Sequence, residues 1–124
     1  MGLFSGLLGI ESETDVSKVQ ESLEEILADD ENVELAYKLI RDLFVFTNKR
    51  LMIINKEGLT GKKTQYHSIP YHSITHFVVE SAGHFDIDSE LKIWIRSTNE
   101  PIVREFKSST NLVAVQKALA NFVL

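Results

Sequence analysis

The sequence contains no cysteine, and this absence removes several kinds of chemistry. A chain without cysteine has no disulfide framework, no thiolate nucleophile and no cysteine-based zinc site. The absence fits a reducing, cytoplasmic setting. No internal repeat, low-complexity tract or linker is present either, so we expect the 124 residues to form one domain around a single core.

Basic residues are also in deficit. The chain has 13 Lys and Arg against 18 Asp and Glu, which gives a formal net charge of −5. Proteins that bind nucleic acid gain affinity when Lys and Arg displace counterions from phosphates, and anionic membrane surfaces attract basic patches. The charge therefore argues against a nucleic-acid partner and lowers the expectation of membrane binding.

No long hydrophobic run is present, although residues 1–10 are apolar and rich in glycine. This segment is too short to span a bilayer and lacks the positive start of a secretory signal. Gly6 stands where a myristoylation signal has Ser or Thr. We expect the segment to pack on its own domain or on a neighbouring subunit; the alternative is that Leu3 and Phe4 touch a membrane.

The remaining pattern is that of a mainly β, α+β protein. Apolar residues recur at helical spacing over residues 15–28, which predicts an amphipathic helix after the caps at 12–15. Alternating or continuous apolar runs, separated by turn residues, then predict about seven strands. A last helix follows the capping residues 108–110. The predicted strands cover residues 33–40, 43–46, 50–55, 63–69, 71–81, 87–97 and 102–107.

Five segments of the chain form an ordered set: Lys38–Leu51, Gly58–Lys63, Ser68–Ile74, Gly83–Asp86 and Glu90–Ile95. Together and in this order they resemble the bacterial pleckstrin homology (PH)-like domain family. The resemblance implies a bent antiparallel sheet or open barrel with a C-terminal capping helix over residues 33–124. Residues 1–32 then supply the apolar segment and the N-terminal helix. The resemblance also implies a small domain without catalysis, and some members of the family resemble ring-forming homo-oligomers.

PH domains are best known for binding phosphoinositides through a basic loop between their first two strands. In this chain the corresponding junction is Ile40–Leu43, which is too short to wrap a headgroup. The segment Gly58–Lys63 does not match a phosphate-binding P-loop, which needs four residues between its glycines and a helix after it. A basic rim where two hairpins end is one interpretation of Lys49, Arg50, Lys56, Lys62 and Lys63, although solvated turn lysines are the favoured interpretation.

The four histidines do not predict a metal site. Zinc needs three or four ligands that converge, and His72 and His76 on one strand would lie about 13 Å apart. His84 and Asp86 suggest a structural hydrogen bond at a bend. We therefore predict no catalytic residue, no metal and no cofactor.

Trp94 is the most informative aromatic residue. Strand alternation places it on one face with Lys92 and Arg96, so its indole is expected to be half exposed. Protein contacts favour such amphipathic aromatics, but a cover by the N-terminal helix would explain it equally well.

Two functional hypotheses remain. The first is a cytoplasmic, non-enzymatic module that self-assembles through exposed strand edges and the N-terminal segment and binds a protein partner. The alternative is a membrane-surface or lipid-headgroup module in which Leu3, Phe4, Leu7 and Leu8 insert while basic turns touch the headgroups.

Overall fold

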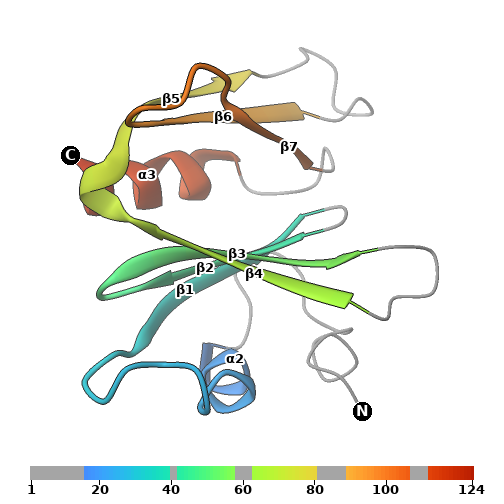
Figure 1. Cartoon of the computed structure of the whole chain (residues 1–124), viewed down its shortest axis with the longest axis vertical. Coiled ribbons are helices and arrows are strands. Elements are labelled where there is room, and N and C mark those ends of the chain that lie inside the picture. The colour runs from blue at the N-terminus through green and yellow to red at the C-terminus, as the bar shows by residue number, and fades with distance from the viewer. Residues whose placement is uncertain (1–15, 40–41, 58–62, 81–88, 107–111) are drawn as a thin grey trace. The chain divides into compact units, whose positions relative to one another are not determined.

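The computed structural model describes residues 16–39, 42–57, 63–80, 89–106 and 112–124 (Figure 1). The chain divides into two compact units, residues 1–68 and residues 69–124. The first holds a four-stranded antiparallel sheet in the order β1-β2-β3-β4, and the second a three-stranded sheet in the order β5-β6-β7. Each strand therefore pairs with its neighbour in sequence, as expected of a meander.

The predicted elements are confirmed, with shifts at their ends. The seven strands are β1 (Val33–Lys38), β2 (Asp42–Thr47), β3 (Arg50–Glu57), β4 (Lys63–Pro70), β5 (Ile74–Glu80), β6 (Ser89–Ile95) and β7 (Ile102–Phe106). The helices within the described residues are α2 (Val16–Ser22), the short 3₁₀ helix η1 (Tyr71–Ser73) and α3 (Leu112–Val123). The chain has the PH-like fold, with helices near both ends and two antiparallel sheets of four and three strands.

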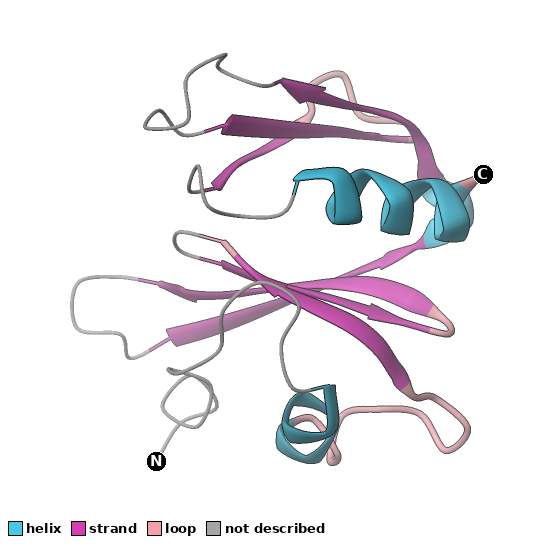
Figure 2. Ribbon diagram, turned by 180° about the vertical axis from the view of Figure 1, so that it is seen from behind, coloured by secondary structure: helices cyan, strands magenta, loops and turns pink. Residues whose placement is uncertain are grey.

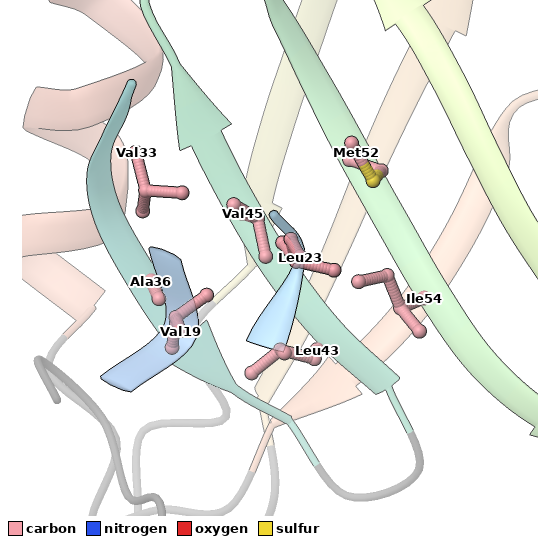
Figure 3. Packing of buried hydrophobic residues seen from close by; sticks show 8 residues of the cluster. All are labelled: Val19, Leu23, Val33, Ala36, Leu43, Val45, Met52 and Ile54. Carbon is pink, nitrogen blue, oxygen red and sulfur yellow. The ribbon is translucent and has the colours of Figure 1, made fainter. Parts of the chain in front are cut away.

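Helix α2 covers one face of the first sheet. Val19 of the helix and Leu23, which directly follows it, are buried against side chains that alternate along β1, β2 and β3 (Figure 3). Burying one such side chain contributes about 1.5 to 3 kcal/mol, so this cluster anchors the helix to the sheet. The strand residues of the cluster are Val33, Ala36, Leu43, Val45, Met52 and Ile54.

The opposite face of the same sheet is also apolar. The six residues of β2 are all buried, which explains why its middle, Leu43–Phe46, is a continuous apolar run rather than an alternating one. Tyr37 and Phe46 meet edge to face on this side, with ring centroids 6.1 Å apart. Phe44 and Ile53 pair beside them and are buried as well.

The first helix is shorter than the pattern predicted. Regular α-helix ends at Ser22, and the backbone then tightens into turns in which Glu24 and Ile26 bond to carbonyls three residues back. The apolar spacing continues to Leu27, which still packs against the cluster. The periodicity thus predicted the buried face correctly but not the helix end.

In the second unit, α3 contacts β5 and η1 (Figure 2). Val115, Ala118 and Leu119 are buried, and the ring of Phe122 stacks on Tyr71 at 5.1 Å. The prediction that residues 71–81 form one strand is wrong at its start. Pro70 cannot donate to a strand ladder, and a 3₁₀ turn over Tyr71–Ser73 follows it.

Candidate functional site

The exposed face of the second sheet gathers aromatic, apolar and acidic side chains. Alternation along β5, β6 and β7 points every second residue away from the buried Leu91 and Ile93. We call this surface the exposed face. Cross-strand pairing arranges it in rows, and its residues are His76, Val78, Glu80, Glu90, Lys92, Trp94, Val103 and Glu105.

The first row is an aromatic stack of Trp94 and His76. These residues are register partners on β6 and β5, and their rings lie 4.4 Å apart at an interplanar angle of 14°. The hydroxyl of Thr75 donates to the carbonyl oxygen of Trp94 at 3.2 Å, and its oxygen lies 3.1 Å from Nδ1 of His76. Aromatic pairs of this kind contribute about 0.5 to 1.5 kcal/mol beyond simple burial, so the two rings hold each other in place.

A bulge makes this stack possible. The pairing of β5 with β6 shifts between Ile74 and His76, so the two strands are out of simple alternation at this point. A bulge re-aims the side chains next to it. His76 is exposed and Trp94 is half buried, as expected for Trp94 from its charged neighbours.

The second row places two exposed valines on either side of a lysine. Val78 is the register partner of Lys92, which in turn pairs with Val103. We call Val78 and Val103 the valine pair. Both are among the large apolar side chains that stay exposed, so this row offers apolar contact area at the surface.

The third row is acidic. Glu80 pairs with Glu90, and Glu90 pairs with Glu105, so three carboxylates lie side by side across all three strands. We call them the glutamate row. Lys92 reaches Glu90 at 3.6 Å. Like charges directly opposite each other destabilise a sheet, so this arrangement has a cost that one lysine offsets only in part.

Two of the basic residues singled out in the sequence, Lys49 and Arg50, are paired with carboxylates. Lys49 pairs with Asp30 at 3.2 Å, and Lys63 is exposed at the start of β4. Lys62, Leu3 and Phe4 lie outside the described residues.

The guanidinium of Arg50 is part of a hydrogen-bond network in the first unit. Its Nε donates to Glu31 Oε2 at 2.8 Å and its Nη2 donates to Glu31 Oε1 at 3.0 Å, so the pairing is bidentate. The same guanidinium donates to the carbonyl oxygen of Ile26 and to the hydroxyl of Ser68. Arg50 therefore ties the α2–β1 connection to β3 and β4, a link between residues 19 positions apart that no local motif reveals.

Glu31 is the buried partner in this network. Its side chain is 1% exposed and also accepts bonds from the Thr47 hydroxyl and the Ala28 amide. Burial raises the pKa of the Glu31 carboxyl, but the hydrogen bonds from Arg50, Ala28 and Thr47, with the charge of Arg50, lower it by more. The pKa of Glu31 therefore lies below its usual value, and the carboxylate is the stable form.

Strand β4 is an edge of the first sheet with both faces largely open. From Gln65 to Ser68 four successive side chains are exposed, so residues on both sides of the strand reach solvent. Tyr66 is 44% exposed in this stretch. Edge strands of this kind are templates for pairing with another chain unless something covers them.

The junction between β1 and β2 is as short as the sequence implied. The Leu39 amide donates to the carbonyl oxygen of Asp42 at 2.8 Å, which closes the hairpin within four residues. A loop of this length cannot surround an inositol phosphate.

Metal and membrane features were also sought in the described part of the chain. It contains no group of three His, Asp or Glu side chains placed to hold a metal ion. His84 and Asp86 lie outside the described residues. None of the described helices is long and apolar enough to cross a membrane.

The meander and its flanking helices define a PH-like domain. Comparison with known proteins identifies the family to which this domain belongs. The model of the family described as "Bacterial PH domain" matches residues 2–123, and the chain belongs to this family. The resemblance noted in the sequence is thereby confirmed. Domains of this family are generally non-enzymatic.

Solved structures support the assignment. The chain is similar to a PH domain from Shewanella amazonensis SB2B, with 53% identity, a TM-score of 0.83 and 99% of each chain covered. It also matches a DUF1696 family protein with a PH domain from Shewanella loihica PV-4, with 52% identity, a TM-score of 0.80 and 91% and 97% of the two chains covered. Among curated proteins, the uncharacterized YjqA of Bacillus subtilis is 53% identical over 97% of each chain.

Proposed function

We propose that this protein is a non-enzymatic cytoplasmic interaction module that assembles with copies of itself through β4 and binds a protein partner. The observation that carries the assembly is the edge position of β4 together with its exposure on both faces. A second copy that pairs along this edge would satisfy backbone groups and cover side chains on either side.

The lipid alternative has less support from the described residues. The β1–β2 junction is closed by the Leu39–Asp42 bond, and Lys49 and Arg50 are engaged by Asp30 and Glu31. A headgroup would have to compete with these carboxylates for the same cations. A protein partner is favoured instead by the exposed face, which combines aromatic, apolar and charged groups as protein interfaces do.

Light scattering coupled to size exclusion tests the assembly. We expect the wild-type mass to be a defined multiple of the chain mass across micromolar concentrations. Tyr66→Lys places a charge on the proposed contact and should shift the protein toward monomer. Val113→Lys is the matched control, because Val113 is 69% exposed on α3 and lies off the edge. A wild-type protein that stays monomeric throughout would defeat the proposal.

A further inference from the structure

Resting on the protein-partner part of the proposed function, we propose that the exposed face of β5–β6–β7 binds an extended basic segment of another protein. The segment would present an apolar side chain to the aromatic stack and valine pair, and Lys or Arg to the glutamate row.

The charge of the face selects the partner. The glutamate row contributes three carboxylates, and Lys92 is the one ammonium group among the described residues of the three rows. A surface of phosphates would be repelled by this row, whereas a basic segment would relieve the repulsion among the three carboxylates. Charge complementarity therefore favours Lys and Arg and disfavours a membrane or a nucleic acid.

The apolar rows give the partner more than charge to recognise. The aromatic stack and the valine pair lie in adjacent rows of the same face, and the valines are exposed. The stack is held in place by its own ring contact and by Thr75, so an incoming side chain meets an ordered surface. Pre-ordered aromatic groups favour binding because less freedom is lost when the complex forms.

The spacing of the rows predicts a pattern in the partner. Adjacent rows are two residues apart along each strand, which corresponds to about 7 Å, so the stack and the glutamate row are about 13 Å apart. A partner that runs along the strands in an extended form would cover this distance in about four residues. We therefore expect an apolar residue and a basic residue about four positions apart.

The position of Trp94 provides a direct readout, because it is the single tryptophan of the chain. The experiment titrates the full-length protein with a short synthetic peptide in which leucine and arginine lie four positions apart. A matched peptide carries glutamate in place of arginine. We expect a saturable change in tryptophan emission with the arginine peptide, at least about tenfold weaker binding of the glutamate peptide, and weakening with added salt.

Charge-reversed variants locate the binding. Glu105→Lys reverses one charge of the glutamate row and should weaken binding of the arginine peptide by about tenfold or more. Glu34→Lys is the control, because Glu34 is an exposed glutamate on β1 of the other sheet. The proposal would be overturned if both variants lost the same amount of affinity for the arginine peptide, or if both peptides bound equally well. It would also be overturned if the emission of Trp94 did not change on titration. Binding to vesicles of phosphatidylserine and phosphatidylcholine in place of the peptide would overturn it too.

The same samples separate this proposal from self-assembly. The native mass of Glu105→Lys should equal that of the wild type while peptide binding is lost. If the wild type is monomeric but binds the arginine peptide through Trp94, the assembly fails and the docking face stands. If the wild type is oligomeric and neither peptide binds, the assembly stands and the docking face fails.

Discussion

In the first unit a buried carboxylate, Glu31 of the α2–β1 connection, accepts hydrogen bonds from two nitrogens of Arg50, whereas in the three-stranded sheet of the second unit three carboxylates face solvent side by side. In the first arrangement, hydrogen bonds and the opposite charge of Arg50 within the same unit stabilise the buried carboxylate. The second leaves repulsion that the described residues offset with Lys92 alone. The contrast separates charge that maintains the fold from charge that stays available for a partner.

The largest expected effect tests whether the second unit depends on its own packing. Leu119 is fully buried and Phe122 stacks on Tyr71, so replacing Leu119 and Phe122 together with Ala removes a core side chain and a ring contact. The loss at Leu119 alone is about 2 to 5 kcal/mol, against a domain stability of about 5 to 15. Near-ultraviolet circular dichroism should show an unfolded or molten protein.

Val113→Ala is the control for this prediction, since Val113 is exposed on the same helix. It should change stability by no more than about 0.5 kcal/mol. If the double variant melted within a few degrees of the wild type, α3 would be a surface appendage.

The next effect concerns the paired charge. Arg50→Met would leave the carboxylate of Glu31 buried without its guanidinium, and breaking such a pair costs about 3 to 5 kcal/mol. Because the Arg50 side chain is itself 25% exposed, we expect the lower end of this range. Urea denaturation measures the change.

Lys49→Met breaks the neighbouring ion pair with Asp30, whose side chain is 80% exposed. Exposed ion pairs contribute about 0 to 1 kcal/mol, so this variant should change the free energy of unfolding very little. Equal destabilisation by the two variants would contradict the distinction between a structural and a surface pair.

The low pKa of Glu31 predicts a dependence on pH. Its folded-state pKa lies below the unfolded one, so its contribution to stability is complete above the unfolded pKa, which is about 4.3 for glutamate. That contribution declines as the pH falls through the lower, folded pKa. Unfolding free energies measured from neutral pH downward should therefore fall less steeply in Glu31→Gln than in the wild type. Glu34→Gln should follow the wild type, because Glu34 is exposed; identical slopes in all three proteins would exclude the effect.

The smallest effect belongs to the glutamate row. Glu105→Gln removes one of the opposed carboxylates and should stabilise the protein by about 0.2 to 1 kcal/mol at low salt. The gain should shrink as salt screens the repulsion. Thermal melts at two salt concentrations measure it, with Glu100→Gln in the β6–β7 turn as the control. Destabilisation by Glu105→Gln would mean that the row is not under strain.

The sequence predicted the fold well because local patterns determine it. Alternation and turn residues identified the seven strands, and the continuous apolar run of β2 indicated burial on both faces. Alternation also put Trp94 beside Lys92. The stack with His76 could not be predicted, because it depends on the register of two strands that contain a bulge.

The same limit applies to the charged groups. Glu80, Glu90 and Glu105 become neighbours only when three strands pair in one register. Arg50 looked like a turn cation because its partner, Glu31, is distant in sequence and joins it through the path of the α2–β1 connection. Local patterns predicted the elements, while the pairing of distant side chains needed the structure.

The sequential order of the strands bears on how the chain folds. In both sheets each strand pairs with the one before or after it, so the native contacts can grow outward from hairpins. Closing a short loop costs little conformational entropy, and isolated hairpins form in about 1 to 10 μs. Chains rich in such local pairings fold faster than those that must first join distant strands. We therefore expect rapid formation of the monomer, with any later, concentration-dependent phase reporting association between chains.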